Sequence, residues 1–424
     1  MMADVAKVFG SCELLLPDFS KIDGTKWATI ACDQFTSEPE YWQKVASFVG
    51  DEPSTLSMIL PEVYLSEREK RIPAINRAMQ EALASYLFPI PDAMIALERK
   101  QSDGQVRGGL VGVIDLEAYD FHKGAKSLIR ATEGTVTERI PPRVEIRKNA
   151  PLELPHVLLL VDDPEKTVIE PVLASAKART PLYDFPLMLD GGQVTGRLLN
   201  QYEQKNIQSA LAALADLDAQ KQKYGEGVDA PLLFAVGDGN HSLAAAKATY
   251  ELLKDEIGPE AAKVHPARYA LCEIENLHDH ALSFEPIYRV FFGCDPEKLL
   301  ADFSSYAATI NGNAKAQRIT ALWSCGTKEL VIPHPKFQLP VGTLKVFIDE
   351  YCKIHPEISV DFIHDKDSLL ALTKKENAIG FLFDGMKKED LFRSVIYDGT
   401  LPRKTFSMGR ARDKRYYLEC RKIQ

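Results

Sequence analysis

The sequence has few cysteines, seven in 424 residues, and no two of them form a Cys-x-x-Cys pair. An odd number of scattered thiols fits reduced, mostly buried side chains better than disulfides or a structural zinc site. Long apolar runs are also missing: stretches such as 157–161 span only a few residues, and the first residues lack the basic leader and apolar core of a secretion signal. We therefore expect a cytoplasmic protein that does not contact a membrane.

Positive charge is scarce relative to negative charge. The chain has 51 Lys and Arg residues against 60 Asp and Glu, a net charge of -9, and no local basic patch stands out. Nucleic acid is therefore not an expected partner. No repeat or heptad array is present, which excludes solenoids and coiled coils. A composition of 45% hydrophobic and 26% charged residues indicates a soluble globular protein with two or three domains, or one domain with large insertions.

The order of apolar patterns in the first third predicts strands mixed with helices. Residues 29–32 form a predicted strand, and Asp33 lies in the loop that follows it. The sequence Ser37-Glu38-Pro39-Glu40 resembles a capping box that opens a helix over 41–48. An amphipathic segment follows at 65–87, and we expect Pro73 to break it into two helices.

The rest of the chain continues the mixed pattern. Two β-rich runs, 94–100 and 108–116, are separated by turn residues and predict a hairpin. The polar stretch 132–155 indicates a functional loop or linker, and helical spacing over 198–224 predicts one long helix. Strand and helix patterns beyond 293 predict a smaller domain. The predicted fold class is mixed α/β, divided into 1–292 and 293–424.

Residues 232–256 predict a buried strand, a tight turn and an amphipathic helix. The turn contains Gly237 and Gly239, which permit close approach of a ligand, and main-chain amides at the helix start favour an anion such as phosphate. Asp238 supplies a hard oxygen ligand suited to Mg²⁺. His241 can donate to phosphate oxygens or move a proton near neutral pH. The turn is therefore the candidate active or nucleotide-binding site.

The same turn also has a purely structural interpretation, which the sequence leaves open. Asp-Gly-Asn is common turn chemistry, and Asn240 or Ser242 can cap the helix while His241 plays no role. The segment is neither a Walker loop nor the Gly-x-Gly-x-x-Gly dinucleotide fingerprint.

The segment Asp238-Gly239-Asn240-His241-Ser242 resembles the Asp-Gly-His-His-Arg signature of free serine kinases, members of the ParB and sulfiredoxin-like superfamily, whose corresponding loop lies against nucleotide phosphates. Most of the chain also resembles the uncharacterised bacterial DUF1015 family, which carries this signature. Four further segments carry that resemblance: Ala31-Cys32-Asp33-Gln34-Phe35, Arg130-Ala131-Thr132-Glu133-Gly134-Thr135, Glu285-Pro286-Ile287-Tyr288-Arg289 and Leu401-Pro402-Arg403-Lys404-Thr405-Phe406.

The resemblance implies a ParB/sulfiredoxin-like nucleotide-binding core with insertions and a smaller C-terminal α/β segment. It also implies a phosphotransferase that uses Mg²⁺ and a nucleotide, ATP or ADP, to modify a small hydroxylated, serine-like substrate. Asn240 and Ser242 replace a histidine and the arginine of the signature, and Tyr288 replaces the histidine of a later element. Losing the arginine removes a bidentate phosphate clamp. A non-catalytic nucleotide-binding switch and a metal-assisted hydrolase using Asp238 and His241 stay open as alternatives.

In the kinase interpretation Asp238 positions the metal, the amides of 239–242 hold phosphate and His241 stabilises developing charge. Asp33 or Glu38 accepts the hydroxyl proton, although either can equally be an ordinary loop or first-turn acid.

Four more residues are secondary candidates for phosphate binding. Glu133 and Arg147 lie in the Arg- and Glu-rich stretch that could clamp a triphosphate, and Lys404 and Thr405 follow a turn beside a basic cluster. A solvated charged face is the alternative for each of them.

Overall fold

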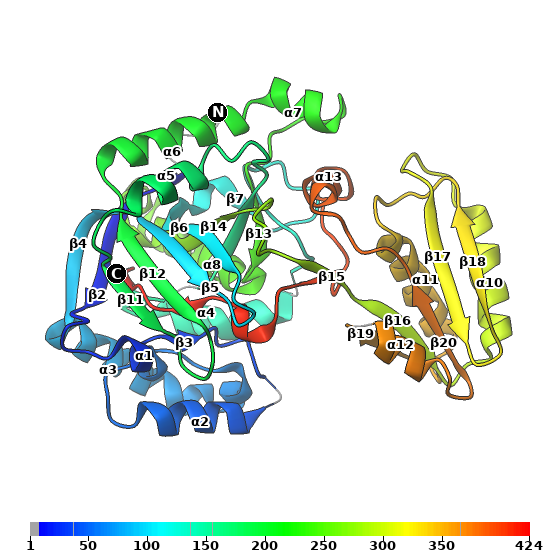
Figure 1. Cartoon of the computed structure of the whole chain (residues 1–424), viewed down its shortest axis with the longest axis horizontal. Helices are drawn as coiled ribbons and strands as arrows, with labels where there is room; N and C mark the ends of the chain where they lie inside the picture. Colours follow the sequence, from blue (N-terminus) through cyan, green and yellow to red (C-terminus); the bar gives the residue numbers. More distant parts are fainter. Residues whose placement is uncertain (1–7, 37, 136, 155, 365) are drawn as a thin grey trace. The chain divides into compact units, whose positions relative to one another are not determined.

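The computed structural model describes residues 8–36, 38–135, 137–154, 156–364 and 366–424, and these residues form two units. The first unit contains Met1–Ala131, Thr135–Leu282 and Arg410–Gln424, and the second contains Thr132–Gly134 and Ser283–Gly409 (Figure 1). Arg410–Gln424 thus belongs to the first unit, whereas the sequence expectation assigned everything after 292 to one C-terminal segment. No helix in the described ranges is long and apolar enough to cross a membrane.

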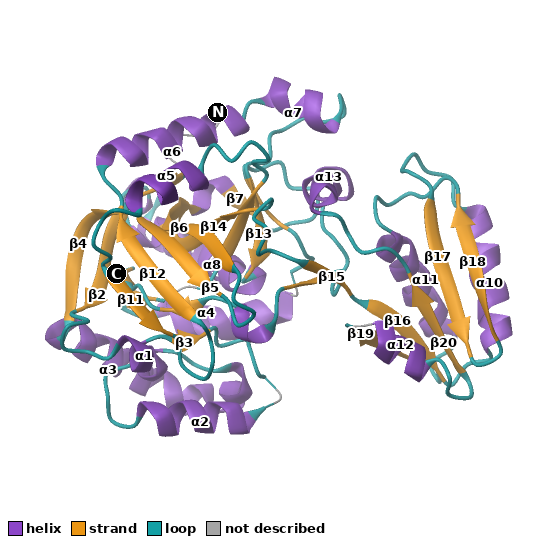
Figure 2. Ribbon diagram, in the orientation of Figure 1, coloured by secondary structure: helices purple, strands orange, loops and turns teal. Residues whose placement is uncertain are grey.

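A mixed sheet of ten strands forms the centre of the first unit, as far as that unit is described (Figure 2). Its order is β11 (Tyr183–Pro186), β12 (Gln193–Leu198), β5 (Ile95–Lys100), β6 (Val106–Asp115), β14 (Tyr269–Asn276), β10 (Leu158–Val161), β13 (Phe234–Asp238), β8 (Ile129–Ala131) and β7 (Tyr119–Asp120), with β1 (Phe9–Gly10) paired to β6. β10 runs parallel to β14, and β8 runs parallel to both β13 and β7; the other pairs are antiparallel.

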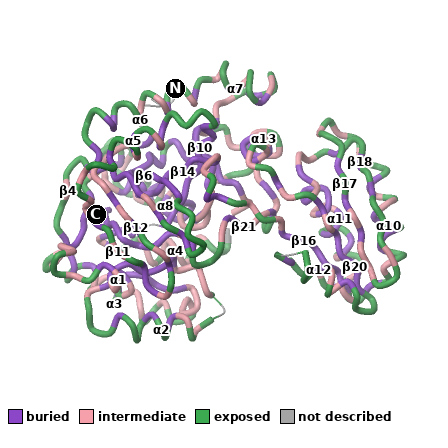
Figure 3. The backbone as a smooth tube through the Cα atoms, viewed as in Figure 1, coloured by how far each residue is buried: buried purple, intermediate pink, exposed green. Residues whose placement is uncertain are grey.

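Alternation along the strands divides the apolar side chains between two cores, one on each face of the sheet. Met94 and Ala96 contribute to one core, whereas Ile95 and Leu97 contribute to the other. The first core also takes residues from α5 (Ile169–Ala176), α6 (Gln201–Leu214) and α8 (Asn240–Ile257); the second takes residues from α2 (Pro39–Val49) and α3 (Arg68–Ser85). Burial along β6, β10 and β14 is visible in Figure 3.

Three short strand pairs tie distant parts of the first unit together. β2 (Cys12–Pro17) pairs with β4 (Leu87–Ala93), β3 (Thr29–Ile30) with β22 (Tyr416–Tyr417), and β9 (Leu152–Glu153) with β23 (Arg421–Lys422). The last two pairs bring the C-terminal residues beside segments from the first 153 positions. The remaining helices of this unit are α1 (Gly24–Trp27), α4 (Ile140–Lys148), α7 (Leu217–Tyr224) and α9 (Pro259–Ala262).

The second unit is built on an antiparallel sheet of five strands, counted over its described residues. The order is β18 (Gly326–Ile332), β17 (Gln317–Trp323), β20 (Ala378–Leu382), β16 (Tyr288–Phe292) and β19 (Ser359–Ile363). The helices are α10 (Pro296–Thr309), α11 (Pro340–Ile354), α12 (Lys366–Leu372) and α13 (Lys388–Asp398), and β15 (Phe284–Pro286) pairs with β21 (Phe406–Met408). Phe303 makes edge-to-face contacts with Phe347 and Phe381, so aromatic packing joins two helices to the sheet.

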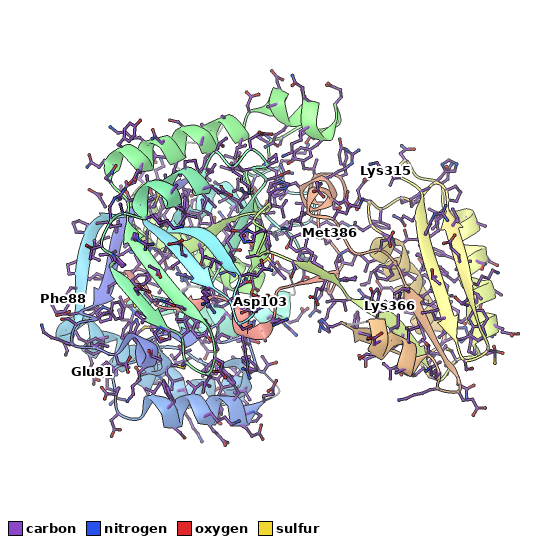
Figure 4. All side chains as sticks on the ribbon, viewed as in Figure 1. Glu81, Phe88, Asp103, Lys315, Lys366 and Met386 are labelled. Carbon is purple, nitrogen blue, oxygen red and sulfur yellow. The ribbon has the colours of Figure 1, made fainter. Side chains whose placement is uncertain are left out.

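The mixed α/β class is confirmed, and so is the predicted hairpin. β5 and β6 pair from Ile95↔Val111 to Lys100↔Val106, and Asp103 lies at the turn between them (Figure 4). Its carboxylate accepts the Gln105 amide, which is the local bond expected of aspartate in a tight turn.

Two helix predictions are wrong. Pro73 lies inside α3, which continues through it. A proline there removes only the bond to the carbonyl of Glu69, and Glu69 is exposed, so water can reach that carbonyl. The expected long helix over 198–224 is two helices, because Asp216 caps a new start by accepting the Ala219 amide.

Two further predictions, one of a loop and one of a helix start, differ from what the described residues show. The stretch 132–155, expected to be a loop, includes α4. Ser37, the first residue of the expected capping box, lies outside the described residues. Glu38 is the N-cap residue of α2 and makes no side-chain capping bond.

Candidate functional site

The turn between β13 and α8 has the strand, turn and helix order that the sequence predicts. Phe234, Ala235 and Val236 are buried in the sheet, and the chain reverses at Gly239, which has a left-handed φ of 82°. A Cβ at Gly239 would lie 3.1 Å from the Val157 Cα, so both the conformation and the close approach require glycine. The helix begins at Asn240 without a side-chain cap from Gly239.

His156 lies against this turn because of strand pairing. β10 and β13 are antiparallel, with Leu158 opposite Asp238, so the two residues that precede β10, His156 and Val157, come beside the end of β13. The His156 side chain is buried, and its Nε2 lies 3.3 Å from the Ser242 Oγ in the first turn of α8. A histidine therefore faces the predicted anion-binding turn from a segment 82 positions earlier in the chain.

Asp33 lies at the same ring nitrogen of this histidine. Its Oδ2 lies 3.5 Å from the His156 Nε2. The Tyr417 hydroxyl lies 2.7 Å from the His156 Nδ1 and accepts the backbone N–H of Cys32 at 3.2 Å. The β3–β22 pair places these residues, because Tyr417 is opposite Thr29. Both ring nitrogens of the histidine thus have polar neighbours.

Lys414 completes the cluster next to Asp238. Its Nζ lies 3.1 Å from the Asp238 Oδ2, and both side chains are mostly buried, 15% and 17% exposed. The other oxygen, Oδ1, accepts the Gly239 amide at 2.9 Å. The carboxylate therefore joins a lysine from the C-terminal segment to the turn that opens α8.

The charges in the cluster shift one another's protonation. Burial alone would lower the pKa of His156, but Asp33 and then Asp238 raise it above its ordinary value. Burial would raise the pKa of Asp33, but His156, the Gln34 amide and Lys414 hold it well below its usual range. Asp33 is therefore ionised at neutral pH, and a protonated His156 is stabilised.

The geometry does not match a hydrolytic Ser-His-Asp relay. Such a relay needs the acid at one ring nitrogen and the hydroxyl at the other. Here Asp33 and Ser242 both lie at Nε2, and Tyr417 occupies Nδ1. Burial raises the pKa of the Cys32 thiol to about 12, so it is not a thiolate nucleophile. The arrangement suits charge stabilisation better than nucleophile activation.

A cavity of about 160 Å³ adjoins the cluster, with His156, Ser242 and Tyr417 in its wall. α4, which packs against α8, contributes Arg143 and Arg147 to the same wall. The site thus has a charged turn and a cavity next to each other in the first unit.

The structure brings some predicted residues together and separates others. Asp33, Asp238 and Ser242 converge on His156 and Lys414, while Gly237, Gly239, Asn240 and His241 make up the turn; His241 is half-buried. Glu38 is exposed at the start of α2. Arg147 pairs with Glu153, which also binds Arg421. Arg147 is therefore a cavity-wall residue held in an ion-pair network.

Glu133, Lys404 and Thr405 belong to the second unit. There Glu133 bridges to Leu401, whose amide donates to the Thr132 carbonyl at 2.7 Å. The buried Arg289 guanidinium donates to the Lys404 carbonyl at 2.9 Å. Three sequence segments singled out above, around 133, 289 and 404, are thus neighbours within one unit.

A protein-only metal cage is not found in the described ranges. No group of three or more His, Cys, Asp or Glu residues there could hold a metal ion. Mg²⁺ bound to a nucleotide takes most of its ligands from phosphate and water and needs only one or two carboxylates. The Asp238 carboxylate fits that smaller requirement.

Sequence reasoning missed His156 and Tyr417, and it favoured a solvent-exposed basic strand for Lys414 over a role at an anionic ligand. The signal for His156 was its position directly before a buried strand run, and the signal for the other two was an aromatic and basic C-terminal segment. Neither pattern says which loop the segment meets, because strand pairing between distant positions decides that.

Comparisons with known proteins give a family and distant structural similarity. Residues 18–395 match the family described as a protein of unknown function (DUF1015), and no curated protein matches the sequence. A conserved hypothetical protein from Pyrococcus furiosus has a TM-score of 0.33 and 11% identity over 74% of this chain and 94% of that one. A free serine kinase in complex with AMP has a TM-score of 0.35 and 11% identity over 74% and 90%. A C-terminally truncated SbnI from Staphylococcus aureus has a TM-score of 0.32 and 10% identity over 70% and 82%.

Proposed function

We propose that this chain, which belongs to the DUF1015 family of proteins of unknown function, is a nucleotide-dependent phosphotransferase acting on a small hydroxylated metabolite. One observation carries the proposal: a lysine, a histidine with a raised pKa and two carboxylates converge on the first turn of a helix. Phosphoryl transfer requires positioning and charge stabilisation of this kind rather than a covalent nucleophile.

The nucleotide phosphates bind at the β13–α8 turn in this proposal. The start of α8 carries partial positive charge from the helix dipole, and Gly239 adds no side chain that would block an approaching phosphate. Lys414 lies on this turn and can exchange part of its contact with Asp238 for a phosphate oxygen. Ser242 and Asn240 supply polar groups in place of the larger side chains of the related signature.

Asp238 is the residue that would hold Mg²⁺, delivered with ATP or ADP. The metal would neutralise charge on the transferred phosphoryl group. Lys414, next to the same carboxylate, would then offset the negative charge of a second phosphate group of the nucleotide. This division of roles predicts that both residues affect nucleotide binding.

The transfer step uses the remaining residues of the cluster. The acceptor oxygen forms a bond to the terminal phosphorus, the bond from phosphorus to the bridging oxygen breaks, and the shortened nucleotide leaves. Asp33, which is ionised at neutral pH, takes the hydroxyl proton. Protonated His156 stabilises the charge that develops on the transferred group. His241, half-buried in the turn, supports the phosphate from the helix side.

A non-catalytic nucleotide-binding switch is the second candidate. It is favoured by one observation: the Ser242 hydroxyl faces His156 where the related signature has an arginine. Losing a guanidinium reduces stabilisation of a transferring phosphoryl group more than it reduces binding of a nucleotide.

The test compares Asp238→Ala with Asp255→Ala, which changes an exposed acid near the C-terminal end of α8, away from the turn. Saturating nucleotide with Mg²⁺ should stabilise the wild-type protein by about 2.7 kcal/mol at a hundredfold excess over Kd. Asp238→Ala should lose this shift and the transfer of phosphate to hydroxylated acceptors, whereas Asp255→Ala keeps both. Full turnover by Asp238→Ala would remove the assignment, and binding without transfer or phosphate release would identify the switch.

A further inference from the structure

The cavity beside His156 is mostly apolar. Its volume is about 160 Å³, and its wall includes Ile59, Leu60, Met79, Ile146, Leu243 and Ala246. These side chains come from four separate segments of the first unit, and the backbone of α4 packs on α8 around them. A mostly apolar cavity of this kind favours a ligand with an apolar body.

One part of the wall is polar and belongs to the charged cluster. His156, Ser242 and Tyr417 line the cavity, and the His156 ring is within 3.5 Å of the Asp33 carboxylate. A ligand inside the cavity can therefore place one hydroxyl at this cluster while its body contacts the apolar wall.

The two arginines in the wall do not require a charged ligand. Arg143 pairs with Glu62, and Arg147 pairs with Glu153. Each guanidinium thus has a carboxylate partner, and Arg147 shares Glu153 with Arg421. An uncharged ligand body fits this wall without leaving a charge exposed to it.

The volume decides what size of ligand fits. An engineered apolar cavity of about 150 Å³ binds benzene, so the space here accommodates one six-membered ring or a short branched chain. The hydroxymethyl group of serine would fill only a small part of this cavity. The rest of the apolar wall would then have no ligand atoms in van der Waals contact with it.

We infer that the acceptor is an alcohol whose remaining part is uncharged, apolar and about the size of one six-membered ring. It binds in this cavity with its hydroxyl group at His156. The inference rests on the proposed function for the assignment of the cavity to the acceptor, and it departs from a serine-like acceptor. The apolar wall selects the body of the molecule, and the cluster selects the hydroxyl.

Benzyl alcohol and L-serine form the probe pair, because both present a hydroxymethyl group and differ in the rest of the molecule. Ligand-observed NMR titration should give benzyl alcohol a Kd at least about tenfold below that of L-serine, since one methylene in an apolar pocket is worth about 10–200-fold. Equal or tighter binding of L-serine overturns the inference.

Ala246→Leu fills the cavity from α8 and should weaken benzyl alcohol binding at least about tenfold. Ala248→Leu makes the same change on the same helix away from the wall and should leave binding unchanged. Unaltered binding by Ala246→Leu overturns the assignment. As a second variant, Ile146→Ala enlarges the cavity and should bind 1-naphthalenemethanol, which the wild type should exclude. If both proteins exclude this compound, the assignment of the cavity is overturned.

Titration with ATP and Mg²⁺ separates this inference from the proposed function. If the nucleotide displaces benzyl alcohol competitively, the cavity holds the base and the acceptor assignment is overturned. If benzyl alcohol binds as expected and no nucleotide binds at all, the cavity assignment stands while the phosphotransferase proposal fails.

Discussion

Asp33 and His156 form an ion pair across the first unit, with the Asp33 Oδ2 3.5 Å from the His156 Nε2. The two residues come from loops 123 positions apart and are held by separate strand pairs, β3–β22 and β10–β13. Because burial opposes the charge on each of them, neither would be ionised as readily without the other.

This pair predicts a pH window for stability. The His156 pKa is raised above 6.5, so its contribution is complete below 6.5 and is lost as the pH rises through the folded-state value. The Asp33 pKa is lowered below 3.8, so its contribution is present above 3.8 and is lost only as the pH falls through the folded-state value. Asp33→Asn should therefore cost most between these limits. Urea midpoints measured from about pH 4 to about pH 9 should show the difference from wild type shrinking on the alkaline side; a difference that grows with pH contradicts the ion pair.

Lys414 predicts an electrostatic contribution to nucleotide affinity. Lys414→Gln keeps a polar side chain but removes the charge next to Asp238, and a lost charge-assisted bond of about 1.5–3 kcal/mol corresponds to about 10–150-fold weaker binding of the Mg²⁺ nucleotide. Isothermal titration at low and high salt provides the measurement. Lys422→Gln is the control, because Lys422 lies in the same C-terminal segment and its side chain is 52% exposed. Equal losses in the two variants would show a general charge effect instead.

The left-handed conformation of Gly239 predicts that a substitution there lowers the free energy of unfolding and disturbs the site. Gly239→Ala imposes a left-handed residue, which costs about 1–2 kcal/mol, and places a methyl group 3.1 Å from the Val157 Cα. Gly124→Ala has a similar φ of 79° with open space around it and should show the backbone cost alone. Chemical denaturation should rank Gly239→Ala as the less stable variant. If Gly124→Ala were the less stable variant, the close approach of residues 156–157 to Gly239 would add no cost, because that backbone moves to make room for the methyl group.

The buried Glu275 leads us to expect a second effect of pH on stability. Burial raises its pKa from 4.5 to about 8, although its Oε1 lies 2.7 Å from the Arg107 Nε. A carboxyl with a raised folded-state pKa contributes stability below 4.5 that is lost as the pH rises to about 8.

Glu275→Gln keeps the shape of the side chain and is uncharged at every pH. Wild type should therefore lose stability relative to this variant as the pH rises from 4.5 to about 8, measured as urea midpoints. A constant difference over that range would show that Arg107 keeps Glu275 ionised throughout.

The sequence predicted local structure well where the pattern was long. The buried run 232–236 followed by two glycines and a helical pattern specified β13, its turn and α8, because each feature depends on neighbouring residues. Where a single residue decided the outcome, local rules failed: Pro73 stayed inside α3, and Asp216 divided one expected helix into two.

Sequence reasoning proposed only some of the residues that form the candidate site. Asp238 and Ser242 were proposed from the turn motif and Asp33 as a candidate base in a separate loop, and the three residues converge on one cluster. The residue at its centre, His156, was not proposed, because its position depends on a β10–β13 register that no local pattern encodes. Lys414 and Tyr417 were hidden for the same reason, since they come from a segment that pairs with β3.

The return of residues 410–424 to the first unit has a consequence for synthesis on the ribosome. The strand that carries Tyr417, and Lys414 just before it, emerge only after the whole 283–409 insertion has been translated. A polypeptide released between positions 239 and 413 contains Asp33, His156 and Asp238 but not the ammonium and phenol groups that meet them. Interrupted translation products therefore lack a complete cluster, however well their earlier segments fold.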